Sequence, residues 1–223
     1  ERSFSFARKP GADTQLTSAE LDRELIAGCG ILHFGSLSLT DEPARSATLE
    51  AVQLARRSGA IIAYDPNYRP LLWPDRATAM RQMQAPLPLV DLLKVSDDEI
   101  VLLTDCSGPE DGARRLIEQG LRCVVVTIGS SGALVATREG CAMVPGFPAK
   151  VVDTNGAGDS FWGGFLTRIS ESGKKLDQIT FEDFQSFARF GNAAASLCVE
   201  KRGAMPAMPD RAAVLRRIAE SGD

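Results

Sequence analysis

Short apolar runs rich in β-branched residues alternate with longer segments of helical periodicity along most of this chain. Residues 61–65, 92–95 and 123–128 are three such runs, and apolar residues three and four positions apart recur between them. Parallel strands need helical crossovers of this length between them. The alternation therefore predicts an α/β fold with a mostly parallel central sheet and helices on both faces.

Capping residues and apolar periods give approximate bounds for the individual elements. Thr17 and Glu20 predict a capping box at the start of a helix that contains Leu25 and Ile26. Polar and apolar residues alternate over residues 3–8, so we expect residues 1–16 or so to form a small lid strand region. Further strands are expected at 31–34, 61–65, 92–95, 123–128, 133–137 and 141–144, and in a run that ends at 151–152. Further helices are expected at 43–58, 96–103 and 109–119, from the turn before Phe161 onward, and at 180–199 and 209–221.

Composition restricts the class of protein. The chain has 223 residues, of which 44% are hydrophobic and 24% charged, and it carries a net charge of -4, so we expect one globular domain over 1–223. No basic block favours a nucleic-acid partner, and no apolar run or signal peptide points to a membrane. Five scattered cysteines without a CxxC pair predict reduced thiols and a cytoplasmic protein. The chain begins at Glu1 within an apparent strand, so we expect the N-terminal part of the domain to be absent.

Residues 153–159 are expected to connect a strand to a helix through a glycine-containing turn. Gly156 and Gly158 lack a Cβ, and their dihedral freedom would let successive amides point at a single anion beside the positive end of the helix dipole. Asp159 would stay ionised beside those amides and could take a proton from a hydroxyl group. An ordinary helix cap is the alternative for so short a pattern.

Polar or glycine-rich segments follow four of the expected strands. Because ligands of open α/β sheets bind beyond the carboxyl ends of the strands, we expect residues 65–69, 96–99, 127–132 and 153–159 to line one site. These segments contain two glycine-rich turns that could bind anions, a pair of acidic residues and an arginine. Such a combination is suited to binding a nucleotide, a metal ion and an acceptor substrate. Phe161 replaces the third glycine of GxGxxG, and no Walker A motif is present, so dinucleotide and P-loop sites are disfavoured.

The string Asp153-Thr-Asn-Gly-Ala-Gly-Asp159 resembles the DTxGAGD signature of the ribokinase-like (PfkB) carbohydrate kinases. Thr127-x-Gly-x-x-Gly132 resembles their second nucleotide motif, and the ordered segments 1–4, 33–39, 64–73 and 94–99 resemble those of fructokinases. The resemblance covers essentially the whole chain. It implies a ribokinase-like fold whose start, with a sugar-binding Asp, Asn and glycine pair and much of the β lid, lies outside this sequence.

The resemblance assigns catalytic and metal roles. Asp159 would be the general base, and the amides of Gly156, Ala157 and Gly158 would stabilise charge on the transferred phosphoryl group. Glu99 would act through water on Mg²⁺ that bridges the ATP phosphates, although Ser96 stands where the broader family has Asn. A solvated position on the first turn of a helix is the alternative for Glu99.

Nucleotide and monovalent-cation roles follow from the same resemblance. A hairpin turn at Gly129 and Gly132 and a buried helical amide at Asn192 are the structural alternatives. The implied nucleotide contacts are Thr127, Gly129, Gly132 and Asn192, and the implied K⁺ site comprises Asp153, Asn155, Cys198, Lys201 and Gly203.

Arg8 and Arg69 are the candidates for binding the sugar. Asn67 would orient Arg69, whose planar guanidinium suits pairs of oxygen atoms on the acceptor or the γ-phosphate. Surface salt bridges are the alternative for both arginines. His33, the single histidine, is expected to be a core residue, which disfavours a serine-hydrolase triad.

These features together predict an ATP-dependent sugar kinase whose preferred acceptor is fructose. The alternatives are 2-keto-3-deoxygluconate kinase, kinases of ribose or aminoimidazole riboside, and a catalytically silent regulatory protein that binds sugar. The expected ligands are a small sugar, ATP, Mg²⁺ and K⁺, and the resemblance implies a homodimer formed through the lid.

Overall fold

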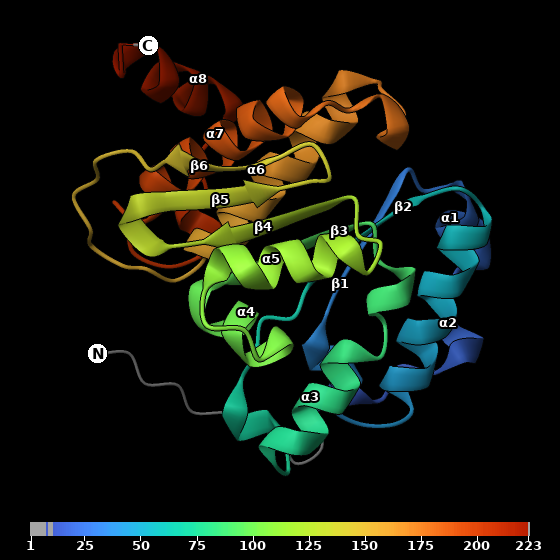
Figure 1. The fold of residues 1–223 in the computed structure, drawn as a ribbon. Helices are drawn as coiled ribbons and strands as arrows, with labels where there is room; N and C mark the ends of the chain where they lie inside the picture. The colour runs from blue at the N-terminus through green and yellow to red at the C-terminus, as the bar shows by residue number, and fades with distance from the viewer. Residues whose placement is uncertain (1–7, 9–10, 223) are drawn as a thin grey trace. The chain divides into compact units, whose positions relative to one another are not determined.

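The computed structural model describes residues 8 and 11–222, and the chain divides into two compact units, residues 1–122 and 123–223 (Figure 1). Each unit has its own strands, its own helices and its own buried residues. Among the described residues, no helix combines the length and apolar character needed to cross a membrane.

The first unit contains three parallel strands. Ile31 pairs with Ile61, and Ala63 pairs with Leu92, so the carboxyl ends of the strands lie at the same edge. The strands are β1 (Ile31–Gly35), β2 (Ile61–Asp65) and β3 (Leu92–Ser96); the α-helices are α1 (Arg23–Gly28), α2 (Ala44–Arg57), α3 (Arg76–Gln84), α4 (Asp97–Thr104) and α5 (Pro109–Glu118); short 3₁₀ helices cover Ala12–Thr14, Ser18–Glu20, Ser36–Leu39, Pro70–Leu72 and Leu87–Leu89.

The core of the first unit lies between these strands and their crossover helices. α2 packs against β1 and β2, while α4 packs against β3. Ile62, Leu92, Leu93 and Ile100 are completely buried. Tyr64 is buried as well, and its hydroxyl donates to the Met83 carbonyl oxygen at 3.3 Å.

The second unit contains three strands that pair in antiparallel fashion. Val124 pairs with Ala136, and Gly132 pairs with Pro145. The strands are antiparallel because the connection at 128–131 is too short for a crossover. The strands are β4 (Cys123–Thr127), β5 (Gly132–Ala136) and β6 (Cys141–Pro145); the α-helices are α6 (Ala157–Ser172), α7 (Phe181–Cys198) and α8 (Arg211–Glu220); 3₁₀ helices cover Gly129–Ser131, Leu176–Gln178 and Met205–Ala207.

An aromatic cluster fixes α6 against α7 in the second unit. Trp162 stacks on Phe165 with ring centroids 5.0 Å apart, and Phe165 meets Phe187 edge to face at 6.2 Å. α7 also packs on β5 and β6 (Figure 1). This packing sets the position of the first turn of α6, which carries the glycine-containing motif.

The expected elements and the observed ones differ in two places, and a third expectation cannot be compared. The run ending at Val152 is not a strand: Val151 and Val152 are exposed, and the Val152 amide donates to the Val199 carbonyl oxygen at 2.8 Å. The capping box at Thr17 is present but caps a 3₁₀ turn, whereas Asp22 caps α1 by accepting from the Leu25 amide at 2.9 Å. Most of the expected strand at 3–8 falls outside the described residues.

Candidate active site

The glycine turn before α6 depends on Gly156. This residue is the N-cap of the helix and has left-handed dihedrals, with φ 77° and ψ 0°. A Cβ at Gly156 would lie 2.9 Å from the Cβ of Ala204, which belongs to the segment after α7. Glycine is therefore required here both for the backbone conformation and for the close approach of that segment.

Two amides in this turn face no acceptor in the part of the chain that the structure describes. The Ala157 amide contacts the Thr154 carbonyl oxygen at 3.4 Å, and the helical ladder begins where Ser160 donates to the Gly156 carbonyl oxygen at 2.8 Å. The Gly158 and Asp159 amides lie between these two and have no hydrogen-bond partner among the described residues. Gly158 is an ordinary helical residue, so of the two glycines Gly156 is the one that uses left-handed dihedrals.

Asp159 carries an accessible carboxylate beside these amides. Its side chain is exposed and makes no hydrogen bond or ion pair with the described residues. It lines a cavity of about 250 Å³ in the second unit, together with Ser160, Gly163 and Phe190. A carboxylate and two adjacent amides that the described residues leave without partners can together bind an anion and accept a proton beside it.

Asp153 ties the glycine turn to the segment that follows α7. Its Oδ1 accepts from the Asn155 amide at 3.0 Å, and its Oδ2 accepts from the Gly203 amide at 2.9 Å. The Cys198 thiol lies 3.7 Å from the Asn155 carbonyl oxygen, and the Lys201 amide donates to the Cys198 carbonyl oxygen at 3.2 Å. The structure thus brings together all five residues expected at the monovalent-cation site.

The hydrogen bonds to Asp153 predict an acid-dependent stability. The amides of Asn155 and Gly203 lower the pKa of the Asp153 carboxyl. Because the folded-state pKa is depressed, the stabilisation is complete above the unfolded value of about 4 and is lost as pH falls through the folded value. Asp153→Asn should lower the free energy of unfolding at pH 7 and flatten its decline below pH 5, as measured by urea denaturation without potassium.

The matched control is Asp177→Asn, because the Asp177 side chain is exposed and has no hydrogen bond or ion pair to described residues. An equal change in the acid dependence of both variants would contradict the assignment to the Asp153 bonds.

The expected nucleotide loop turns the hairpin between β4 and β5. Gly129 has φ 49°, and the Ile128 amide donates to the Gly132 carbonyl oxygen at 2.8 Å. Gly132 has φ 106°, and a Cβ there would lie 2.2 Å from the Val144 carbonyl oxygen. Thr127 is half-buried at the end of β4. The geometry gives the glycines a structural role whether or not the loop also binds a nucleotide.

Asn192 joins α7 to the end of β6. Its Nδ2 donates to the Val144 and Pro145 carbonyl oxygens at 2.9 and 3.0 Å, and the side chain is buried. Both amide hydrogens are therefore used within the protein. This is the buried helical amide that the sequence left open as an alternative.

We expect Asn192→Ala to lower the free energy of unfolding by about 1–3 kcal/mol, because two buried carbonyl groups lose their donor. Urea denaturation measures this loss. The exposed Glu182→Gln on the first turn of α7 is the control. A variant as stable as the parent with weakened ATP binding would instead favour the nucleotide role.

In the first unit, Glu99 connects two of the expected site segments. Its Oε1 accepts from the Tyr68 amide at 2.6 Å, while its Oε2 accepts from the Ser96 amide at 2.8 Å and the Ser96 hydroxyl at 3.0 Å. Ser96 in turn caps α4 by accepting from the Glu99 amide at 3.2 Å. Both oxygens of the Glu99 carboxylate thus accept hydrogen bonds from the protein, so the alternative of a solvated residue on the first turn of the helix does not describe it. The S-x-x-E spacing could have indicated the capping box, but not the contact with Tyr68.

Sequence reasoning missed a buried ion pair next to this contact. Lys94 Nζ lies 2.7 Å from Asp65 Oδ2, and the side chains are only 8% and 5% exposed. Burial raises the pKa of Asp65, the Lys94 ammonium opposes that shift, and the charge of Glu99 adds to it. A lysine within the apolar run of β3 was the available signal.

Arg69 and Asn67 follow β2. Asn67 has φ 47°, and its amide donates to Asp65 Oδ1 at 3.0 Å. The half-buried Arg69 guanidinium donates to the Tyr68 carbonyl oxygen at 3.0 Å.

Arg8 belongs to a separate polar cluster of the first unit. Its guanidinium donates to the Thr40 hydroxyl at 2.9 Å and to Asp13 Oδ2 at 2.5 Å, and the side chain is 13% exposed. These contacts give Arg8 the salt-bridge role that the sequence left open as the alternative to sugar binding.

The expectation that His33 is a core residue is wrong, because His33 is exposed on β1.

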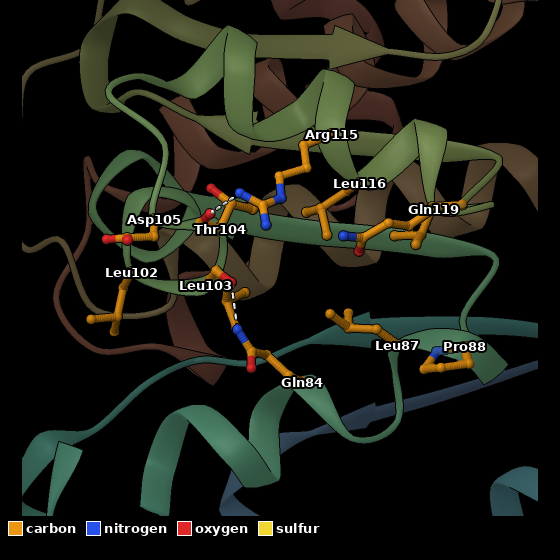
Figure 2. A pocket seen from close by; sticks show the side chains of 11 residues that line it. Gln84, Leu87, Pro88, Leu102, Leu103, Thr104, Asp105, Arg115, Leu116 and Gln119 are labelled. Atoms are coloured by element: carbon orange, nitrogen blue, oxygen red, sulfur yellow. Dashed lines mark hydrogen bonds between the residues drawn. The ribbon is translucent and has the colours of Figure 1, made fainter. Parts of the chain in front are cut away.

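A cavity of about 420 Å³ in the first unit contains none of the candidate residues (Figure 2). It lies at the C-terminal end of α4, where Gln84 donates to the Leu103 carbonyl oxygen at 2.7 Å and Arg115 to the Thr104 carbonyl oxygen at 3.0 Å. These two side chains satisfy carbonyl groups that end the helix, which is a structural role.

Comparison with known proteins identifies the family. The model of the pfkB family carbohydrate kinases matches residues 1–211, and the chain belongs to this family. It is 38% identical to probable fructokinase-5 of Arabidopsis thaliana over 94% of this chain and 64% of the relative. It is 40% identical to fructokinase-2 of Solanum lycopersicum over 94% of this chain and 63% of the relative. The chain thus spans slightly less than two thirds of the length of these relatives.

Solved structures share the fold. The fructokinase of Xylella fastidiosa with bound ATP superposes with a TM-score of 0.92 at 31% identity, over 100% of this chain and 71% of that one. A double mutant of the Vibrio cholerae O395 fructokinase, in a form with fructose, ADP and potassium ion bound, superposes with a TM-score of 0.87 at 30% identity, over 96% of this chain and 67% of that one. Aminoimidazole riboside kinase of Salmonella enterica, complexed with aminoimidazole riboside and an ATP analogue, superposes with a TM-score of 0.83 at 29% identity, over 97% of this chain and 71% of that one. The expected α/β, ribokinase-like fold is confirmed.

Proposed function

We propose that this protein is an ATP-dependent sugar kinase that phosphorylates fructose. The observation that carries the proposal is the first turn of α6, where the amides of Gly158 and Asp159 and the Asp159 carboxylate have no partner among residues 8 and 11–222. Such a turn can hold a phosphoryl group while the carboxylate takes the proton of the attacking hydroxyl. The names of the similar proteins support fructose as acceptor and ATP as donor.

The donor set fits the proposed nucleotide and metal ions. Among the described residues, no three His, Cys, Asp or Glu side chains gather as a metal centre, so Mg²⁺ would be held mainly by ATP phosphates and water. Glu99 Oε1 has one lone pair left for such a water. Asp153 and the carbonyl groups of Asn155 and Cys198 are oxygen donors suited to K⁺. Thr127, Gly129 and Asn192 are proposed to lie next to the nucleotide.

The proposed acceptor contacts are Arg69, Asn67 and Arg8. Arg69 supplies planar donors for sugar or phosphate oxygens. Arg8 requires rearrangement of its bonds to Asp13 and Thr40 before it can serve a sugar. We further propose that residues 1–223 belong to one kinase domain, because one family model spans 1–211. A cytoplasmic location and a homodimer through the lid strand region complete the proposal.

The test is ADP release by the full-length protein with fructose, 2-keto-3-deoxygluconate, ribose and aminoimidazole riboside, each with and without K⁺. Turnover that depends on fructose supports the proposal, and loss of rate without K⁺ supports the cation site. Preference for ketodeoxygluconate would move the acceptor to the acid sugars. Binding of sugar or ATP without turnover on any substrate would leave a regulatory protein.

A further inference from the structure

The four residues Pro66, Asn67, Tyr68 and Arg69, here called the arginine loop, are held at successive backbone groups. The Pro66 carbonyl oxygen accepts from the Ser36 amide at 3.1 Å. The Asn67 amide donates to Asp65 at 3.0 Å. The Tyr68 amide donates to Glu99 at 2.6 Å, and the Tyr68 carbonyl oxygen accepts from Arg69 at 3.0 Å. Three segments distant from the loop or preceding it, at Ser36, Asp65 and Glu99, therefore fix its backbone.

The side chains that hold the loop are themselves fixed from β3 and α4. Asp65 is held by the buried Lys94 ammonium at 2.7 Å. Glu99 is held by the Ser96 amide and hydroxyl. Asn67 adopts φ 47°, a left-handed conformation that is uncommon outside glycine and that asparagine tolerates better than most residues.

We propose that Lys94 and Glu99 are positioning residues for phosphoryl transfer, and that they act by fixing the arginine loop and with it the Arg69 guanidinium. The proposal rests on the proposed kinase function and deepens it. In this proposal Lys94 acts without contacting the substrate. Its buried ammonium fixes the Asp65 carboxylate, and Asp65 in turn accepts the hydrogen bond from the Asn67 amide. Glu99 acts directly on the Tyr68 amide, and three of its four lone pairs are used within the protein.

The first readout is independent of activity. Glu99→Gln replaces one carboxylate oxygen with an amide nitrogen that cannot accept a hydrogen bond. We expect amide exchange at Asn67 and Tyr68 to accelerate about tenfold, measured by NMR, with exchange in β2 unchanged. Lys94→Met should do the same if it folds, since it leaves Asp65 buried without its partner. Glu110→Gln and Lys150→Met are matched exposed controls. Unchanged exchange in the loop of folded Glu99→Gln would overturn the proposal.

The second readout separates positioning from a role in metal binding. If Glu99 acts through Arg69, Glu99→Gln should lower kcat about 10²-fold alone but scarcely further in an Arg69→Ala background. Rate losses that add in the double variant would overturn the positioning role, because Glu99 would then act independently of Arg69; a raised Mg²⁺ requirement would assign the whole loss to the water on Mg²⁺. A protein without kinase activity that still shows faster exchange in the loop would overturn the proposed function and the catalytic part of this inference, while the clamp itself would stand.

Discussion

Asp159→Asn is expected to lower kcat for sugar phosphorylation by about 10²–10⁴-fold with little change in the KM for ATP. The reason is that asparagine keeps the size and hydrogen-bonding oxygen of the side chain but cannot take the proton. The Asp159 side chain makes no hydrogen bond or ion pair with the described residues, so the fold should not depend on it. ADP release at saturating sugar, with the melting temperature recorded in parallel, measures both quantities.

The control for this variant is Glu182→Gln, which removes an exposed acidic residue from the first turn of α7. Both substitutions weaken a favourable charge–dipole interaction at a helix N-terminus by a similar small amount. Equal, minor effects on kcat would mean that Asp159 is only a helix-stabilising charge. That result would also remove the observation on which the kinase proposal depends most.

Gly132→Ala is expected to lower the free energy of unfolding by about 2–6 kcal/mol, because strain and overpacking act together. The new Cβ would lie 2.2 Å from the Val144 carbonyl oxygen and 2.5 Å from the Gly146 amide nitrogen. The backbone conformation, with φ 106° and ψ -133°, is also one that a residue with a Cβ rarely adopts. Urea denaturation followed by tryptophan fluorescence measures the loss, since Trp162 lies in the same unit.

Gly129→Ala is the matched control in the same hairpin turn. A Cβ at Gly129 meets no atom within 4 Å, and φ 49° lies in the left-handed region at a cost of about 1–2 kcal/mol. A loss as large as that of Gly132→Ala would show that the turn conformation, and not the close approach of β6, makes glycine necessary at 132.

Much of the fold could be predicted because the signals are local. β2 has the bounds expected from its apolar run, and α4 begins after Ser96 as the capping pattern indicates. The strand predicted to end at Val151 and Val152 is absent, because two β-branched residues favour a strand only when a neighbouring strand is available to pair with them. Here the Val152 amide bonds instead to the segment after α7.

The sequence predicted the glycine turn before α6 but not the contacts that surround the other candidate residues. The motif located the glycine turn and Asp159, since a left-handed N-cap and a helix N-terminus follow from a few consecutive residues. The motif assigned Glu99 to a metal ion, and that role remains a prediction. Its bonds to Ser96 follow a local capping pattern, but its bond to Tyr68 could not be predicted, because that bond depends on the register of β2 and β3.

By itself, the sequence determined the α/β class, most element bounds and the turn that presents free amides. Periodicity, capping and backbone sterics act over a few residues, so they can be read without the fold. The tertiary structure alone decided which distant groups meet. Glu99 reaches Tyr68 across 31 positions, Asn192 reaches Val144 across 48, and Asp153 reaches Gly203 across 50. Such partners are selected by strand register and helix packing, which no local pattern encodes.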